Sequence, residues 1–215
     1  MKIPFPKTPF YLIRHGETAA NILGKTSGIK DIDLTEKGIK QAEHAALLFE
    51  ALDLKDVIIF SSPLKRALKT AEIINQGKHE LIVLDQLIER DFGLWEGEEW
   101  VVILSKLESG LHPPKGETTL HHIERSLSAF TYILNASASM GTTPLIVSHG
   151  GSFYTFGRFY NQTKILSVGN CELYYFHPFS PSEEEENLII PWKTWNVKFS
   201  SSTHLFYEAN QLYAN

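Results

Sequence analysis

Short apolar runs that alternate with helix-like segments are the feature that most constrains how this 215-residue chain folds. The runs are apolar at nearly every position rather than at every second one, which is typical of parallel strands covered by helices on both faces. We predict strands at residues 10–13, 57–60, 80–84 and 144–148. Since parallel strands are joined by helical crossovers, the pattern predicts an α/β fold, namely a three-layer α/β/α sandwich with a mostly parallel central sheet.

The segments between the predicted strands have the apolar spacing of amphipathic helices. One helix is predicted to begin after Thr35, whose hydroxyl suits the N-cap position. A second is predicted to begin at Ser62 as the cap, with Pro63 in the first turn, where a proline is tolerated. A third is predicted within residues 119–134. These helices are expected to cover the sheet.

Length and composition limit the classes of protein to which the chain can belong. Its 215 residues, 43% hydrophobic and 21% charged, suffice for one large domain, and we predict a single domain over residues 1–215. The net charge of −5 argues against a protein that mainly binds nucleic acid or an anionic membrane. One cysteine, Cys171, excludes an intrachain disulfide framework and fits a reducing compartment. The N-terminus lacks an apolar signal segment, so we expect a soluble, cytoplasmic protein.

Charged and histidine side chains gather just after the predicted strands. Arg14 and His15 follow the first strand, and Arg66 lies in the first turn of the helix after the second. Glu89 lies just past the third strand, and His149 follows the fourth. In an open parallel sheet the C-terminal strand ends share one edge, and ligands bind in the crevice outside that edge. We therefore expect these side chains to converge, although they are far apart in the sequence.

This set of side chains suits the chemistry of a phosphomonoester. Two arginines can hold the phosphate dianion, because the planar guanidinium matches its oxygens. A neutral imidazole can attack phosphorus and carry the phosphoryl group covalently, and nearby arginines lower the pKa of such a histidine. A second histidine can donate to the transferring oxygens, while a carboxylic acid can protonate the leaving group and then activate water. The chemistry requires no metal or other cofactor.

Four segments that contain these residues resemble the signature blocks of the histidine phosphatase superfamily, phosphoglycerate mutase-like branch. They are LIRHGETAAN, SSPLKRALKTA, LIERDFGLWEG and VSHGG, and they come in the family order within residues 12–151. The resemblance implies the family's three-layer α/β sandwich, with His15 as the phosphorylated nucleophile and Glu89 as the proton donor. The other residues of the phosphate pocket would be Arg14, Arg66 and His149.

The resemblance also implies further residues around the substrate. Asn21 matches the family asparagine that contacts the same phosphate. Ser27 and Gly28 fall where the family often has a small hydroxyl residue and a glycine on the substrate side. We predict no metal ligand. The predicted substrate-binding residues are Arg14, Asn21, Ser27, Gly28, Arg66, Glu89, His149 and Gly150.

Mutases of the family carry a long basic insertion after the acid, which holds the second acidic end of their substrate, and this chain shows no such clamp. Residues 90–148 hold four basic residues against seven acidic ones. The segments FGLWEG and PPKGETTLHHIERSLSAF also resemble those of the family's small phosphatases. We therefore predict hydrolysis of a small phosphorylated metabolite. The acidic run EGEEWV after the motif predicts a preference against highly anionic substrates.

Other interpretations stay open. A cofactor-dependent phosphoglycerate mutase-type isomerase would share the four blocks. A regulatory module that binds a phosphorylated ligand would fit the acidic mouth and the unassigned segment after residue 164. Asp91 and Glu96 compete for the role of the acid. His121 and His122 cannot share one helix face, so a solvated helix is favoured over a zinc site.

Overall fold

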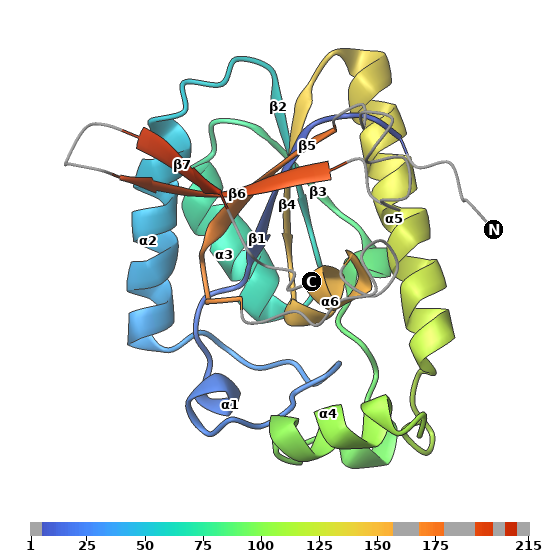
Figure 1. Ribbon diagram of the computed structural model, residues 1–215. Coiled ribbons are helices and arrows are strands. Elements are labelled where there is room, and N and C mark those ends of the chain that lie inside the picture. Colours follow the sequence, from blue (N-terminus) through green and yellow to red (C-terminus); the bar gives the residue numbers. More distant parts are fainter. Residues whose placement is uncertain (1–5, 157–167, 179–191, 200–204, 210–215) are drawn as a thin grey trace.

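The computed structural model of the protein describes residues 6–156, 168–178, 192–199 and 205–209 (Figure 1). It contains a seven-stranded sheet in the order β3-β2-β4-β1-β5-β6-β7. The neighbours β3, β2, β4 and β1 run parallel, and β5, β6 and β7 continue the sheet as antiparallel strands. The strands are β1 (Phe10–Arg14), β2 (Val57–Ser61), β3 (Glu80–Val83), β4 (Thr143–Ser148), β5 (Leu173–Pro178), β6 (Trp192–Phe199) and β7 (Leu205–Ala209).

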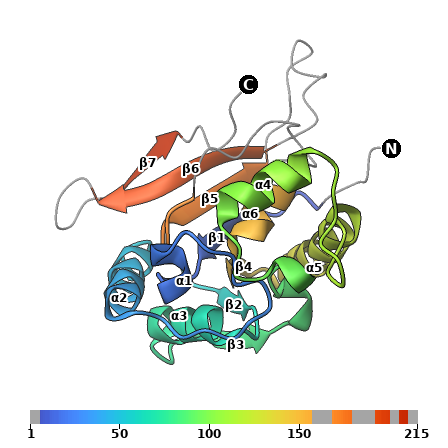
Figure 2. The ribbon, with the colours of Figure 1, turned by 90° about the horizontal axis from the view of Figure 1, so that it is seen from below.

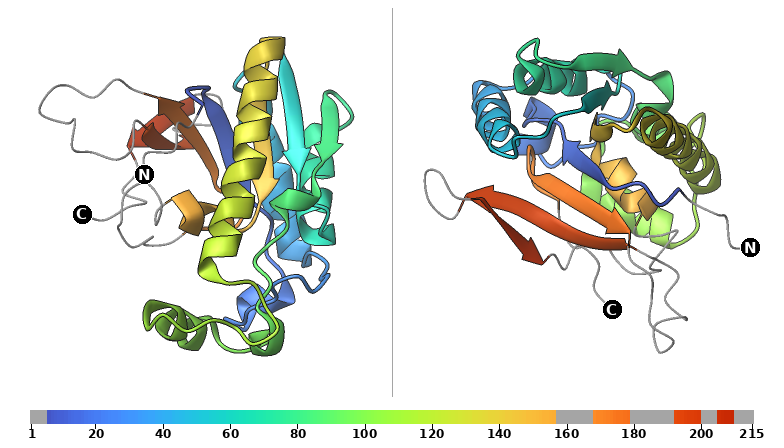
Figure 3. Two further views of the ribbon diagram at one scale, coloured as in Figure 1. Left: turned by 90° about the vertical axis from the view of Figure 1, so that its right-hand side faces the viewer. Right: turned by 90° about the horizontal axis from the view of Figure 1, so that it is seen from above.

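Helices cover both faces of the sheet, which gives the three layers (Figure 2, Figure 3). On one face α2 and α3 pack against the strands, and on the other α5 and α6 do so. At the end of the sheet toward which the parallel strands run lie α1 and α4 (Figure 1). The helices are α1 (Ala19–Ile22), α2 (Glu36–Glu50), α3 (Lys65–Asn75), α4 (Trp100–Glu108), α5 (Thr119–Met140) and α6 (Gly150–Phe156), with 3₁₀ turns at Asp85–Leu87 and Gly93–Trp95.

Two hydrophobic cores follow from the alternation of side chains along the central strand β1. Phe10 and Leu12 belong to the core beneath α5, and Tyr11 and Ile13 belong to the core beneath α2 and α3. None of these side chains is more than 3% exposed. Burying such a side chain stabilises the fold by about 1.5–3 kcal/mol. The strand that leads to His15 is therefore fixed from both sides.

The structure confirms the predicted α/β class and the predicted strands, each of which differs by one residue at one end. Thr35 caps α2, because its hydroxyl accepts a hydrogen bond from the Gly38 amide at 3.0 Å. The helix predicted within residues 119–134 continues to Met140. Among the described residues, no helix is long and apolar enough to cross a membrane.

The helix cap predicted at Ser62 is wrong. Helix α3 begins at Lys65, and its N-cap is Leu64, which makes no side-chain capping bond. The physical reason is that Ser62 still continues the line of β2, since its amide donates to the Val147 carbonyl at 3.1 Å. A residue held in the strand ladder cannot begin the helix, and its hydroxyl is left for another partner.

Candidate active site

The C-terminal ends of the parallel strands bring the predicted site residues together. Arg14 ends β1, His15 follows it, His149 follows β4, and Arg66 lies in the first turn of α3. The ring centroids of His15 and His149 are 5.2 Å apart, and Arg66 Nε donates to His15 Nε2 at 3.2 Å. Glu89 is near enough for its charge to act on both arginines. The residues that the sequence scatters over the chain thus meet at one edge of the sheet.

His15 is held as a neutral ring whose lone pair, on Nε2, accepts from Arg66 Nε. Its Nδ1 lies 2.8 Å from the Gly16 carbonyl oxygen, and since a carbonyl only accepts, Nδ1 carries the proton. The lone pair is therefore on Nε2, which faces Arg66. Burial, followed by the charges of Arg66 and Arg14, holds the pKa of His15 well below its usual range. The imidazole is thus in its nucleophilic form at neutral pH.

Arg66 is fully buried and is held by the loop that contains Gly28. Besides its contact with His15, it donates from Nη1 to the Lys30 carbonyl at 2.8 Å and from Nη2 to the Gly28 carbonyl at 2.7 Å. Gly28 has a φ of +46°, and a Cβ there would overlap the Glu96 carboxylate. This position therefore needs glycine. Gly28 acts on the site through its backbone.

The competing acids Asp91 and Glu96 are engaged by backbone amides of the loops around the site. Asp91 Oδ1 accepts from the Gly93 amide at 2.7 Å. Glu96 Oε1 accepts from the Ile29 amide at 2.9 Å, and burial raises the pKa of this carboxyl group. Ser27 is half-buried at the start of the same loop. These side chains shape the loops that border the strand ends.

Arg14 has one buried donor that lacks a partner. Its Nη1 donates to the Val168 carbonyl at 2.8 Å, and the Cys171 amide donates to the Arg14 carbonyl at 2.9 Å. Its Nε is buried and has no hydrogen-bond partner in the part of the chain that the structure describes. An unsatisfied buried donor costs about 1–3 kcal/mol. An anion bound at this edge of the sheet would satisfy it.

His149 has the same kind of unfilled group. Its Nε2 lies 2.8 Å from Ser62 Oγ, whereas Nδ1 is buried without a partner among the described residues. Burial and the charge of Arg66 hold the pKa of His149 well below its usual range, so the ring is neutral and carries one proton. When the Ser62 hydroxyl donates to Nε2, that proton lies on Nδ1 and can be donated to a ligand oxygen. Nothing in the sequence around Ser62 indicates this role.

Glu89 is held by backbone amides on both carboxylate oxygens. Oε1 accepts from the Arg90 amide at 2.7 Å, and Oε2 accepts from the Gly151 amide at 3.1 Å. A Cβ on Gly151 would overlap Oε1, so this close approach requires glycine. Gly150 begins α6 beside Arg14, because a Cβ there would lie 3.9 Å from Arg14 Nε.

Asn21 has its oxygen fixed in an internal network. Oδ1 accepts from the Thr18 amide and hydroxyl, both at 3.1 Å, and from Asn170 Nδ2 at 3.2 Å. The side-chain nitrogen Nδ2 of Asn21 is thereby the group that can donate to a ligand oxygen. Asn170 also donates to the His15 carbonyl at 2.8 Å. The sequence does not indicate Asn170 as a site residue, since only the fold brings this residue next to His15.

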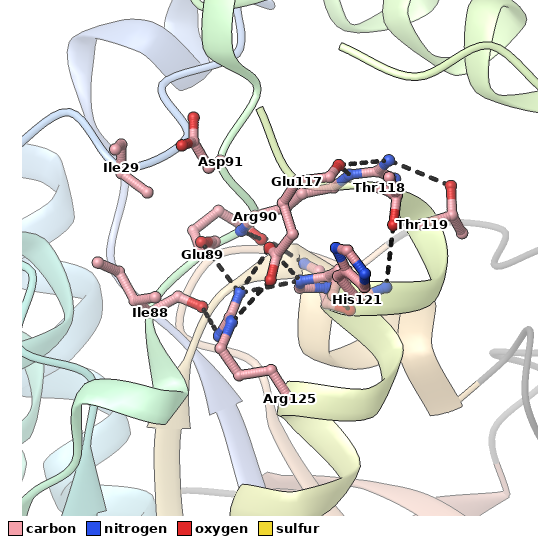
Figure 4. Close-up of polar contacts among 12 residues, drawn as sticks. Ile29, Ile88, Glu89, Arg90, Asp91, Glu117, Thr118, Thr119, His121 and Arg125 are labelled. Atoms are coloured by element: carbon pink, nitrogen blue, oxygen red, sulfur yellow. Dashed lines mark hydrogen bonds and ion pairs between the residues drawn. The ribbon is translucent and has the colours of Figure 1, made fainter. Parts of the chain in front are cut away.

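A polar cluster, here called the Arg125 cluster, consists of Glu117, His122 and Arg125. Figure 4 shows Glu117 and Arg125 beside Glu89. Arg125 donates to both oxygens of Glu117, at 2.9 and 2.8 Å, and His122 Nδ1 lies 3.3 Å from the same carboxylate. Burial raises the pKa of Glu117, but the contacts with His122 and Arg125 outweigh burial and lower that pKa to about 2. Glu117 is therefore ionised throughout the neutral range.

The solvated environment expected for His122 is wrong, because its side chain is only 1% exposed. On α5 it lies on the side that packs toward α6, and its Nε2 is 3.2 Å from the Gly151 carbonyl oxygen. His121, one residue earlier, is exposed as expected. Among the described residues, no group of histidines, cysteines and carboxylates could hold a metal ion.

A pocket of about 260 Å³ opens beside Glu89. Its arginine, Arg125, is already saturated by Glu117 and by three backbone carbonyls, those of residues 86, 88 and 89. A ligand in this pocket would therefore contact carboxylates, a lysine and apolar surface rather than free guanidinium groups. Its lining residues are Ile29, Ile88, Glu89, Asp91, Lys115, Gly116, Glu117 and Arg125.

Comparison with known proteins gives a family match. The model of the histidine phosphatase superfamily (branch 1) matches residues 10–175. A 2,3-bisphosphoglycerate-dependent phosphoglycerate mutase of Thermoplasma acidophilum is 44% identical over 101 residues, which cover 46% of this chain and 50% of the mutase. An acid phosphatase of Mycobacterium tuberculosis is 34% identical over 149 residues, which cover 65% of this chain and 68% of the phosphatase. The chain thus spans only half of the mutase and about two thirds of the phosphatase.

A solved structure resembles the chain over a larger share of its length. It is that of a phosphoserine phosphatase from Entamoeba histolytica in complex with 3-phosphoglyceric acid. The TM-score is 0.68 and the sequence identity 30%, and the match covers 81% of this chain and 95% of the other. Similarity thus extends to relatives whose names include both a mutase and phosphatases.

Proposed function

Because this chain belongs to the histidine phosphatase superfamily, branch 1, we propose that it hydrolyses phosphomonoesters through a phosphohistidine intermediate on His15. The observation that carries the proposal is the state of the His15 ring, which is buried and neutral and has its Nε2 lone pair beside Arg66. The unfilled donors Arg14 Nε and His149 Nδ1 support a phosphate in the same place.

The proposed reaction has two steps that share one carboxyl group. In the first, the lone pair on His15 Nε2 attacks phosphorus, and the bond from phosphorus to the ester oxygen breaks while Glu89 gives its proton to that oxygen. In the second, the Glu89 carboxylate takes a proton from water, whose oxygen attacks phosphorus as the phosphorus–nitrogen bond breaks. Inorganic phosphate leaves, and both residues return to their starting forms. Charge on the phosphoryl oxygens is stabilised by Arg14, Arg66 and His149.

We propose that the substrate is a small phosphorylated metabolite without a second strongly acidic group. The pocket beside Glu89 supports this substrate class, since it contains the carboxylates of Asp91 and Glu117. Arg125 cannot serve as a second anion clamp, because its donors are taken by Glu117 and by backbone carbonyls. Because Arg125 has no free donors to retain a bisphosphate, we propose that water, rather than a retained substrate, accepts the phosphoryl group from the phosphohistidine.

The proposal is tested by phosphate release from p-nitrophenyl phosphate and from a panel of sugar phosphates, phosphoglycerates, nucleotides and phosphopeptides, at acidic and neutral pH. We expect release by the wild-type protein and loss of release to background in His15→Ala. The matched control is His44→Ala, which removes an exposed histidine on α2 and is expected to keep full activity.

Three outcomes would contradict the proposal. Release that is unchanged in His15→Ala would exclude a phosphohistidine on this residue. Interconversion of 2- and 3-phosphoglycerate that is faster than hydrolysis and stimulated by the bisphosphate would assign the chain to the mutases. Binding of phosphorylated ligands that survives His15→Ala, with no turnover by the wild type, would favour a regulatory module.

A further inference from the structure

The position of the Glu89 carboxylate depends on two peptide segments. Its oxygens accept from the amides of Arg90 and Gly151, at 2.7 and 3.1 Å. One amide belongs to the segment after β3, and the other belongs to the start of α6. Whatever fixes these two segments therefore also fixes the proton donor.

Arg125 fixes the first segment. Its Nη1 donates to the carbonyl oxygens of Gln86 and Ile88, at 2.7 and 2.9 Å, and its Nη2 lies 3.4 Å from the carbonyl oxygen of Glu89 itself. The bidentate pair with Glu117 sets the plane of the guanidinium (Figure 4). One side chain on α5 thus holds three backbone carbonyls of the segment that ends at the acid.

His122 connects the same cluster to the second segment. Its Nε2 donates to the Gly151 carbonyl oxygen at 3.2 Å, and its Nδ1 lies 3.2 Å from Arg125 Nη2. A Cβ on Gly151 would overlap both Glu89 and His122, so the three groups are in close contact. The Arg125 cluster therefore touches both of the segments whose amides hold the Glu89 carboxylate.

We propose that Arg125, oriented by Glu117 and His122, is a positioning residue that holds Glu89 at the oxygen of the leaving group. The inference rests on the proposed function, because it concerns the proton donor of that reaction. A general acid speeds a reaction by about 10²–10⁴-fold when it is correctly placed. Aryl esters have a leaving group that is already a weak base, so they need this proton less than alkyl esters do. Misplacement of Glu89 therefore slows the hydrolysis of alkyl esters more than that of aryl esters.

The test compares kcat/KM for p-nitrophenyl phosphate and for glycerol 2-phosphate in the wild type and in Arg125→Lys. Lysine keeps the positive charge beside Glu117 but lacks the fork that reaches the carboxylate and the carbonyls together. Since kcat/KM reports the step that forms the phosphohistidine, it reports the protonation of the leaving group. We expect the loss on the alkyl ester to exceed the loss on the aryl ester by at least ~10-fold.

A double-mutant cycle with Glu89→Gln separates positioning from a general structural effect. If Arg125 acts through Glu89, then Arg125→Lys adds no further ester-selective loss when Glu89 is already Gln. The control is Lys78→Met, which removes an ion pair with Glu50 away from the site and is expected to leave the ratio of the two esters unchanged.

The outcomes distinguish this inference from the proposed function. If the wild type hydrolyses neither ester, the proposed function fails first. If the wild type is active but Arg125→Lys reduces both esters equally, or if the losses add in the double variant, the positioning role is wrong. Vanadate affinity close to that of the wild type would report an intact phosphate pocket. Should Arg125→Lys fail to fold, His122→Leu with the same two esters decides the question, because leucine has no donor for the Gly151 carbonyl.

Discussion

The hydroxyl of Ser62 is the hydrogen-bond partner of His149 Nε2. Oγ accepts from the Leu64 amide at 3.3 Å and lies 2.8 Å from His149 Nε2. With the amide as its donor neighbour, the hydroxyl can direct its own hydrogen at Nε2, which leaves the histidine proton on Nδ1. In that arrangement, Ser62 keeps the proton of His149 on the nitrogen that would donate to the transferring oxygens.

Replacement of this hydroxyl should therefore lower activity. We expect Ser62→Ala to reduce kcat/KM about 10-fold, since one hydrogen bond is worth about 0.5–1.5 kcal/mol and the proton of His149 is no longer directed to Nδ1. The matched control is Ser61→Ala, which removes a buried hydroxyl that donates to the Ser62 carbonyl oxygen. Steady-state kinetics and thermal unfolding of both variants check this, and equal losses of kcat/KM would contradict it.

The start of α2 packs directly against the loop that follows His15. A Cβ on Gly16 would overlap the Gly38 carbonyl, and a Cβ on Gly38 would overlap the Glu17 carbonyl. The Thr35 amide also donates to the Glu17 carbonyl at 2.9 Å. The helix therefore packs against the loop after His15 more closely than a side chain at Gly16 or Gly38 would allow.

This close packing predicts that Gly38→Ala destabilises the protein. Alanine normally stabilises a helix by about 1 kcal/mol relative to glycine, so a lower unfolding temperature would reverse the usual sign. Because the displaced loop carries His15, we also expect a lower kcat/KM. Glu43→Ala, on the exposed side of the same helix, is the control and should leave both quantities nearly unchanged. A Gly38→Ala protein more stable than the wild type would contradict the prediction.

The elements that sequence could predict are those whose signal is local. The strands were visible because their residues are apolar on both faces, and Arg14, His15 and His149 could be placed because they directly follow strands. Asn170 and the contact between His122 and Gly151 carry no local signal, since they depend on which loops meet in the folded chain. The Ser62 prediction failed for the same reason, because its amide pairs with a distant strand.

Folding keeps two histidines neutral in the interior of the protein. The pKa values of His15 and His149 lie well below the ordinary 6.5, chiefly because of burial. The unfolded chain therefore binds more protons than the folded chain just below this pH, so stability is full above about pH 6.5 and falls as the pH is lowered.

The single domain expected over residues 1–215 stays a prediction, as it includes segments outside the described residues.

This linkage can be measured by thermal unfolding at about pH 8 and about pH 5. We expect the unfolding temperature of the wild type to fall more over this interval than that of His15→Gln, which has no imidazole to protonate at that position. If the unfolding temperatures of the wild type and of His15→Gln fall equally over this interval, burial of neutral His15 does not contribute to acid sensitivity.

The hydrogen bond from His15 Nδ1 to the Gly16 carbonyl also decides the chemical identity of the proposed intermediate. Phosphohistidine exists as two regioisomers, and a nitrogen that is bound to a carbonyl through its proton has no lone pair to offer phosphorus. Only the isomer phosphorylated on Nε2 is compatible with this backbone contact. A chain trapped during turnover should therefore contain a single phosphohistidine isomer, distinguishable from the other by its nuclear magnetic resonance spectrum.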